Sequence, residues 1–218
     1  MQRAEGSLQR PALLPPVWRG PAPLILASRS RSRRALLSAV GLDVEAVAAD
    51  IDERALEDRR LAAGASLEGL ATELARAKAL AVSALRPDAY CLGADQTLTL
   101  DGRIFHKSRD LDEGRRTLAA LSGKTHRLTS AFCVARAGHP LVVHRDHADL
   151  RMRALAPDEI SRYLERAGPG VLASVGVYQG EGLGIHLFEH IEGDHSVVLG
   201  LPMLSLLAWM RDKNLVSL

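Results

Sequence analysis

The sequence is poor in several features that would mark particular classes of protein. It has only two cysteines in 218 residues, Cys91 and Cys133, and both lie within apolar runs typical of strands. We therefore expect buried free thiols in a reducing cytoplasm and no disulfide framework. No apolar run reaches the roughly 18 positions that a membrane helix needs, and Leu13–Val17 is too short and proline-rich for a signal peptide. We expect no contact with a membrane.

Aromatic residues are also scarce, at 4% of the chain, and none stands among the arginines of residues 29–34. Residues 1–34 nevertheless carry seven arginines against one glutamate, whereas the whole chain has a net charge of +2. A basic segment on a mildly acidic remainder suits an anionic ligand, although a solvated arm would have the same composition. A nucleic-acid partner is the least favoured alternative, because base stacking needs aromatic side chains.

The remaining composition, 47% hydrophobic and 25% charged, is that of an ordinary globular protein. Residues 1–22 contain four prolines and no periodic pattern, which predicts a disordered N-terminal extension before a single domain over 23–218. Strands and helices alternate along this domain, and two long strands, at 125–135 and 141–152, follow each other directly. The sequence therefore predicts a mixed sheet in an α/β or α+β fold.

Residues 88–107 concentrate the candidate catalytic chemistry. A short apolar strand runs into Asp95, and Asp101-Gly102 predicts a hairpin turn that brings the chain back to Lys107. We expect Asp95 at the end of a buried strand with Lys107 close by, which would pair an acidic base or metal ligand with a phosphate-binding cation. The alternative is an aspartate that caps a turn and a lysine on the surface.

A second candidate site lies between an expected strand at 24–27 and an expected helix at about 32–40. The connecting segment holds small hydroxyl side chains and arginines, including Ser28, Ser30 and Arg33. Free backbone N–H groups at a helix N-terminus, together with arginine, form a cradle for phosphate. A serine-capped helix with solvated arginines is the alternative, since no glycine-rich loop accompanies the segment.

Three further features are open to two interpretations. Asp50-Ile51-Asp52-Glu53 follows an expected strand and could hold a divalent cation through carboxylate oxygens, or form an exposed loop. Lys78 lies off the most apolar stripe of a helix expected at 66–85, which favours a surface lysine. Repeated glycines at 176–184, before a strand expected at 184–188, either let the backbone approach a ligand or mark bends.

Seven short motifs, in order along the chain, resemble those of the Maf family of nucleoside triphosphate pyrophosphatases. The motifs are Leu26-Ala27-Ser28-x-Ser30-x-x-Arg33, Asp50-Ile51-Asp52-Glu53, Ala75-x-x-Lys78-Ala79, Gly93-Ala94-Asp95, Asp101-Gly102 with Lys107, Leu121-Ser122-Gly123-x-x-His126, and Ile191-Glu192-Gly193 with Gly200-Leu201-Pro202. The resemblance implies cleavage of a triphosphate to a monophosphate and pyrophosphate, with Mg²⁺ or Mn²⁺. It also implies an elongated, bent mixed sheet between two lobes with a central cleft, similar to the inosine triphosphate pyrophosphatase fold, and a possible homodimer.

The resemblance assigns roles to individual side chains. It makes Asp95 the residue that activates water and a metal ligand, with Glu53 as a second carboxylate and metal ligand. The catalytic residues it implies are Asp95, Glu53, Lys78 and Lys107. The substrate-binding residues it implies are Ser28, Ser30, Ser32, Arg33, Gln96 and Glu181.

Base preference follows from two of these positions. Gln96 and Glu181 resemble the branch of the family that hydrolyses 7-methyl-GTP, and a carboxylate can accept from both N1–H and the exocyclic amine of guanine. Tyr178 could stack on the base or pack in the core. The sequence departs from the family at Ser32, a position linked to base preference, so dTTP or UTP remains the alternative substrate. A nucleotide-binding regulator of cell division is the alternative from another class.

Overall fold

A computed structural model describes residues 16–217 of the chain, so residues 1–15 of the expected extension lie outside the described part. Residues 16–22 differ from the expected disordered segment. Trp18 forms a β-bridge with Val216, and the Arg19 N–H donates to the Leu215 carbonyl at 2.8 Å. Val17 and Trp18 also pack against buried apolar side chains. The prolines exclude helix here, but they do not prevent this pairing with the C-terminal segment.

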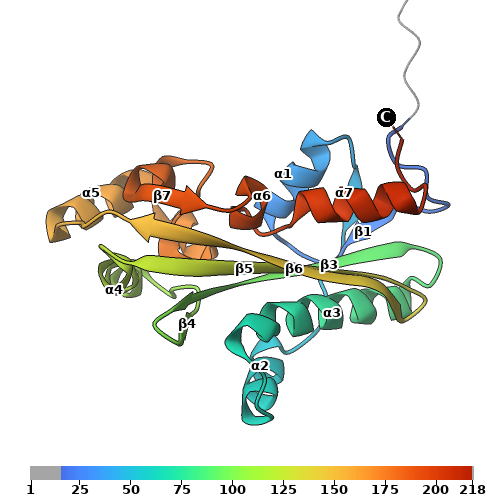
Figure 1. Cartoon of the computed structure of the whole chain (residues 1–218), viewed down its shortest axis with the longest axis horizontal. Helices are drawn as coiled ribbons and strands as arrows, with labels where there is room; N and C mark the ends of the chain where they lie inside the picture. The colour runs from blue at the N-terminus through green and yellow to red at the C-terminus, as the bar shows by residue number, and fades with distance from the viewer. Residues whose placement is uncertain (1–15, 218) are drawn as a thin grey trace, which may run out of the picture.

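Seven strands form one mixed sheet in the order β2-β1-β3-β5-β6-β7, with β4 paired to β3. The strands are β1 (Leu24–Leu26), β2 (Val44–Ala46), β3 (Tyr90–Leu100), β4 (Arg103–Phe105), β5 (Thr125–Arg136), β6 (His139–Met152) and β7 (Phe188–Glu192). β1 is parallel to β2 and β3, and the other pairs are antiparallel. The predicted mixed α/β fold is thus confirmed, with the long β5–β6 hairpin extending along the molecule (Figure 1).

The helices flank this sheet. They are α1 (Arg31–Ala39), α2 (Glu53–Ala62), α3 (Leu67–Leu85), α4 (Leu111–Leu121), α5 (Pro157–Ala167), α6 (His195–Val198) and α7 (Met203–Asp212), with 3₁₀ turns at Pro169–Ala173, Val175–Val177 and Leu183–Leu187. None of the helices in residues 16–217 is long and apolar enough to cross a membrane.

One helix was not expected, and one expected strand is absent from its place. The acidic segment continues into α2, because the Asp52 side chain accepts the Ala55 N–H at 2.9 Å and caps the helix. The strand expected at 184–188 is a 3₁₀ turn, and β7 starts only at Phe188. The closely spaced glycines Gly180, Gly182 and Gly184, which precede the turn or lie within it, favour tight bending over pairing.

The two largest hydrophobic cores lie along the sheet, and β3 contributes to both. Leu92 and Ala94 pack into a core formed with β1, α1 and α7, whereas Leu98 and Leu100 pack into a core formed with α4 and α5. Figure 1 shows α1 and α7 on one side of the sheet and α2 and α3 on the other. Asp95 therefore lies between the parts of β3 that belong to these two cores.

The close approach of α3 to β3 depends on one glycine. A Cβ on Gly93 would lie 2.2 Å from the Ala75 carbonyl oxygen and 2.5 Å from the Ala79 nitrogen. Since no side chain fits in this space, glycine on the strand and alanine on the helix bring the two backbones into contact. Lys78, which lies between the two alanines, is thereby held against the sheet.

Candidate active site

The candidate site occupies a break in strand pairing along one edge of β3. On this edge β1 pairs with β3 only as far as Leu92, and β4 pairs from Leu98 onward. Residues 93–97 therefore have no strand beside them there, and the chain that follows β1 takes up the space. Asp95 lies in the middle of this gap and is 8% exposed. We expected Asp95 at the end of a strand, but it lies inside an 11-residue strand.

A cluster of three charged side chains forms around Asp95. The Lys78 ammonium donates to Asp95 Oδ1 at 2.5 Å and lies 2.9 Å from Glu53 Oε2. Lys78 is only 7% exposed, so the interpretation as a surface lysine was wrong. Glu53, at the first position of α2, remains exposed. The lysine holds the two carboxylates together from the α3 side of the sheet.

Burial decides the protonation behaviour of Asp95. Desolvation raises the pKa of the Asp95 carboxyl above its ordinary value, while the Lys78 and Arg33 charges oppose that rise. A carboxylate with a raised pKa accepts a proton from water more readily than an exposed one. The environment of Asp95 therefore suits a general base.

Arg33 approaches the gap from α1 and is held by uncharged oxygen atoms. Its Nε donates to the Gly200 carbonyl at 2.8 Å, and its Nη1 donates to the Ala94 carbonyl at 2.9 Å and to Ser28 Oγ at 3.2 Å. Burial lowers the pKa of Arg33, and the nearby charges of Asp95 and Glu53 oppose this. All three side-chain hydrogen bonds that the structure shows for Arg33 go to neutral acceptors, so its charge remains available to a phosphate.

The two predicted serines help to build this segment. Ser30 caps α1, because its Oγ accepts the Arg33 N–H at 3.3 Å, and Ser28 Oγ accepts the Ser30 N–H at 3.2 Å. The strand–loop–helix arrangement expected for a phosphate cradle is therefore present.

Lys107 is not brought into this cluster. It is exposed, and the adjacent His106 contacts α2 instead, with Nε2 at 2.7 Å from Arg54 and 3.4 Å from Glu57. The hairpin thus places Lys107 beside the helix that carries Glu53, but no ion pair within residues 16–217 joins Lys107 to Glu53 or Asp95.

Gln96 faces away from Asp95. The β3–β5 register pairs Asp95 with Ala131 and Gln96 with Ser130, and successive strand residues point to opposite faces. Asp95 accordingly meets α3, whereas the Gln96 amide meets α6 on the other side. The structure does not bring Gln96 together with Asp95 and Lys78. Reading residues 93–96 as continuous strand would have revealed this alternation from the sequence.

Two of the three residues that the resemblance links to base preference, Ser32 and Glu181, are in contact. Ser32 Oγ donates to Glu181 Oε1 at 2.8 Å, although 149 positions separate them in the chain. Ser32 belongs to α1, and Glu181 belongs to the glycine-rich loop that follows residues 175–177. This contact joins α1 to the glycine-rich loop.

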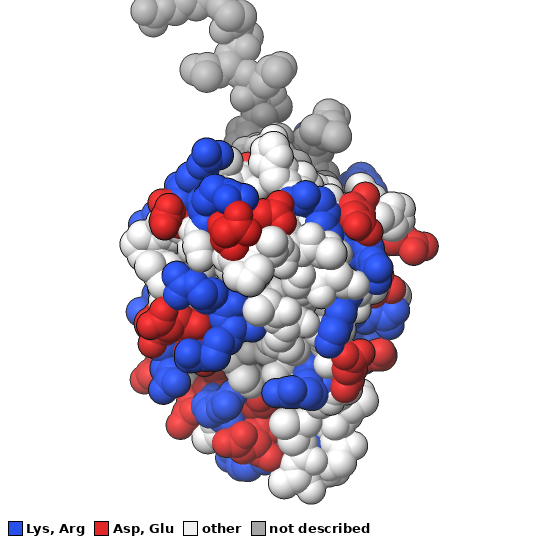
Figure 2. Space-filling model, turned by 90° about the vertical axis from the view of Figure 1, so that its left-hand side faces the viewer, with Lys and Arg blue, Asp and Glu red and all other residues white. Residues whose placement is uncertain are grey.

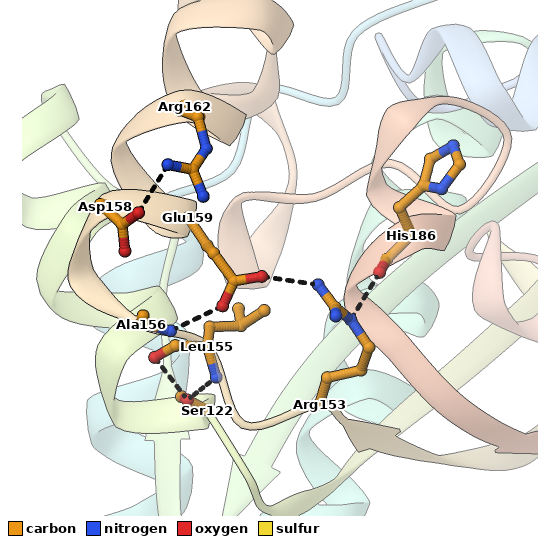
Figure 3. Close-up of polar contacts among 8 residues, drawn as sticks. All are labelled: Ser122, Arg153, Leu155, Ala156, Asp158, Glu159, Arg162 and His186. Carbon is orange, nitrogen blue, oxygen red and sulfur yellow. Dashed lines mark hydrogen bonds and ion pairs between the residues drawn. The ribbon is translucent and has the colours of Figure 1, made fainter.

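Two contacts anchor the loop that carries Glu181. At its start, the buried Tyr178 hydroxyl lies 2.6 Å from His126 Nε2, so Tyr178 packs in the core and is not free to stack on a base. At its end, Arg153 Nε donates to the His186 carbonyl at 3.0 Å and Arg153 Nη2 contacts Glu159 at 3.3 Å (Figure 3). The loop is therefore tied to β5 and to α5.

Burial of His126 should make stability depend on pH. His126 is 1% exposed, and burial lowers its pKa to about 4, so the folded protein keeps it neutral while the unfolded chain protonates near pH 6.5. Stability should fall by about 3 kcal/mol as the pH drops from about 6.5 to about 4. Denaturant unfolding of wild type and His126→Gln across this range would measure it. Equal losses in both proteins would contradict the assignment.

The end of the molecule with α4 and α5 shows basic and acidic side chains interspersed rather than one basic stripe (Figure 2). Pairs at this end account for the pattern. They are Arg109–Glu113, Arg115–Asp112, Arg153–Glu159 and Arg162–Asp158. Such exposed pairs contribute little to stability. This face therefore offers no extended positive surface for a nucleic-acid backbone.

Two hollows lie away from the cluster. One, of about 280 Å³, is lined by Arg116, Leu155 and Ile160 among others, and one of about 420 Å³ lies near Glu68 and Arg127. Neither hollow is lined by Asp95 or Lys78, so neither belongs to the candidate site.

Comparison with known proteins gives a consistent result over nearly the whole chain. A nucleoside triphosphate pyrophosphatase from Nitrobacter hamburgensis is 49% identical over 93% of this chain and 99% of its own. A 7-methyl-GTP pyrophosphatase from Mesorhizobium japonicum is 53% identical over 89% of this chain and 98% of its own. A solved nucleoside-triphosphatase / dITP/XTP pyrophosphatase from Mycobacterium abscessus is weakly similar, at 16% identity and a TM-score of 0.39 over 89% of this chain and 96% of that one. Residues 23–213 match the family model described as Maf-like protein. The chain therefore belongs to the Maf family.

Proposed function

We propose that this chain is a nucleoside triphosphate pyrophosphatase that hydrolyses the bond between the α and β phosphates. The observation that carries the proposal is the buried Asp95–Lys78–Glu53 cluster, with the Arg33 guanidinium beside it, in the unpaired segment of β3. The two relatives described above, which share about half of their residues with this chain, bear names that agree with it.

The residues fit the requirements of phosphoanhydride hydrolysis. Asp95 orients and deprotonates the attacking water, and its raised pKa suits that role. Arg33 supplies positive charge where the leaving pyrophosphate develops negative charge, and Lys78 offsets the negative charge of Asp95 and Glu53 beside the phosphates. Ser28 and Ser30 contribute a helix N-terminus for the phosphate chain. We retain Lys107 as an additional phosphate contact from the side of α2.

The donor set also fits a divalent metal ion. Carboxylate oxygens of Glu53 and Asp95 converge on one cation, the Lys78 ammonium, and Mg²⁺ or Mn²⁺ prefers such oxygens. No group of three or more acidic, histidine or cysteine side chains in residues 16–217 could hold a metal alone. Mg²⁺ usually binds through one or two carboxylates together with substrate phosphates. When bound, it would neutralise phosphate charge.

We propose 7-methyl-GTP or a related modified guanine nucleotide as substrate. Glu181 is exposed and contacts α1 through Ser32, so its carboxylate lies at the rim of the phosphate cradle. A carboxylate there pairs with two donors of guanine, whereas uracil and thymine offer a single N–H. dTTP or UTP is the alternative.

The two cysteines indicate the compartment in which the enzyme works. The free cysteines, Cys91 and Cys133, are buried, which suits a reducing compartment, and we place the enzyme in the cytoplasm. We treat residues 23–218 as one catalytic domain, since the strand that carries Asp95 contributes to both hydrophobic cores.

A nucleotide panel tests this proposal. Purified protein with Mg²⁺ is incubated with 7-methyl-GTP, GTP, ITP, CTP, UTP and dTTP, and pyrophosphate release is measured. We expect the highest kcat/KM for 7-methyl-GTP. A preference for UTP or dTTP would agree with the proposed reaction but contradict the assignment of guanine as the base. No turnover of any nucleotide would contradict the proposed function.

A further inference from the structure

The orientation of Arg33 depends on contacts made on the face of the sheet opposite to α3 (Figure 1). Its Nε donates to the carbonyl of Gly200, which lies just after α6. Gly200 has φ of 97°, and a Cβ there would lie 3.3 Å from Arg33 Nε and 3.4 Å from Nη2. The acceptor of Arg33 is therefore a backbone atom whose position is set by how α6 sits on the sheet.

Gln96 fixes the end of α6. Its Nε2 lies 3.0 Å from the carbonyl oxygens of both Val197 and Val198, the last two residues of the helix. It also lies 3.0 Å from Ser130 Oγ, which itself donates to the Val197 carbonyl at 2.7 Å. A four-residue helix has little stability of its own, so these side-chain donors hold it in place.

Both backbone carbonyls that hold Arg33 are connected to Gln96. Gln96 and Ala94 lie on the same strand, two residues apart. Ala94 accepts from Arg33 Nη1, while Gln96 holds the helix that leads to Gly200, the acceptor of Arg33 Nε. The guanidinium is thus fixed between two backbone carbonyls whose separation depends on the Gln96 amide.

The fixed orientation keeps Arg33 away from ion pairing. Asp95 and Glu53 are near enough to oppose the lowering of the Arg33 pKa, yet the hydrogen bonds that the structure shows for its guanidinium are all to neutral oxygens. If the Gly200 carbonyl shifted, the guanidinium would be free to turn toward a carboxylate, and its charge would then be lost to a phosphate.

We propose that Gln96 is a positioning residue of the reaction: it holds α6 against the sheet, fixes the Gly200 carbonyl, and so keeps Arg33 oriented for the substrate phosphates. This inference rests on the proposed function only for its kinetic consequence. The binding of pyrophosphate by Arg33 can be measured without any turnover.

The first test is pyrophosphate binding to Gln96→Leu, which keeps a side chain of similar size and removes the amide. We expect the Kd of pyrophosphate, measured by titration calorimetry, to rise about tenfold or more relative to wild type. Thr129→Val is the matched control, because it removes a buried hydroxyl of the same strand pair that has no hydrogen-bond partner in the structure. It should leave the Kd unchanged.

A double-mutant cycle separates positioning from a general loss of stability. If Gln96 acts through Arg33, adding Gln96→Leu to Arg33→Ala should not weaken pyrophosphate binding further, although Gln96→Leu alone weakens it. Wild-type affinity in Gln96→Leu, or additive losses in the double variant, would overturn the proposal. Should Gln96→Leu not fold, Ser130→Ala takes its place, because it removes the second side chain that donates to the Val197 carbonyl. It too should weaken pyrophosphate binding alone and should not weaken it further in Arg33→Ala. A different result would contradict the proposed function and leave the positioning role intact. In that result the Gln96 and Ser130 variants bind pyrophosphate more weakly, while the wild-type protein binds it but hydrolyses no nucleotide.

Discussion

Asp95→Asn is expected to lower kcat by about 10²- to 10⁴-fold. The amide keeps the size of the carboxyl and can still accept the Lys78 hydrogen bond, but it cannot take a proton from water. The measurement is the rate of pyrophosphate release at saturating nucleotide, with a thermal melt of each protein to show that it is folded.

The matched control for this variant is Asp101→Asn, on the hairpin turn that follows the same strand. Asp101 is exposed and has φ of 50°, a conformation that asparagine adopts readily, so the fold should tolerate the change. The control should retain wild-type kcat. Similar rates in the Asp95→Asn and wild-type proteins would contradict the role of Asp95 as base.

The pH profile gives an independent reading of the same assignment. Burial raises the pKa of Asp95, so protonation of this carboxyl should reduce kcat/KM on the acidic side at a pH above that of an ordinary aspartate. The sign is fixed, because the active form is the carboxylate and activity is lost as the pH falls.

Glu181→Gln is expected to change the choice of base. The carboxylate is positioned to accept two hydrogen bonds from a guanine, and losing such charge-assisted bonds should lower kcat/KM for 7-methyl-GTP by about 10- to 100-fold. For UTP the same change should leave kcat/KM equal or higher, since glutamine supplies both a donor and an acceptor. The measurement is the ratio of kcat/KM for the two nucleotides in wild type and variant.

A matched control for this change is Glu189→Gln, on β7 beyond the loop. Glu189 is exposed, and the ion pair that residues 16–217 show for it is with the exposed Arg151, at 3.5 Å, so the nucleotide ratio should not move. An unchanged ratio in Glu181→Gln as well would show that Glu181 does not read the base.

The sequence predicted those parts of the fold that local patterns determine. The alternation over 125–135 and 141–152 corresponds to β5 and β6, and the apolar spacing over 66–85 corresponds to α3. Helix α2 escaped detection because only Leu56 and Leu61 contribute large apolar side chains to it. Its N-terminal signals, Asp52 as cap and Glu53 in the first turn, were nevertheless present.

Burial of Lys78 could not be predicted from periodicity, because it depends on tertiary contact. Gly93 and the alanines on either side of Lys78 let helix and strand approach closely, and only then does the lysine reach Asp95. The helical pattern favoured a surface position for Lys78, whereas the motif resemblance singled out the same residue as a site residue, which stays a prediction.

In the candidate site, too, the sequence indicated residues but not their contacts. Resemblance named Arg33, Ser32 and Glu181, but not the contacts among them and their neighbours. Neither the Ser32–Glu181 hydrogen bond nor the carbonyl acceptors of Arg33 leaves a signal in the sequence, since backbone oxygens are the same at every residue and long-range pairing depends on the fold.

The most direct test of the account is the position of bond cleavage in 7-methyl-GTP. Phosphorus NMR of a reaction in ¹⁸O-labelled water identifies the products and the one that carries the label. We expect 7-methyl-GMP and pyrophosphate in equal amounts from the wild-type protein, and the same products from Asp95→Asn at a rate about 10²- to 10⁴-fold lower. Release of orthophosphate and 7-methyl-GDP, or equal product formation by Asp95→Asn, would contradict the account.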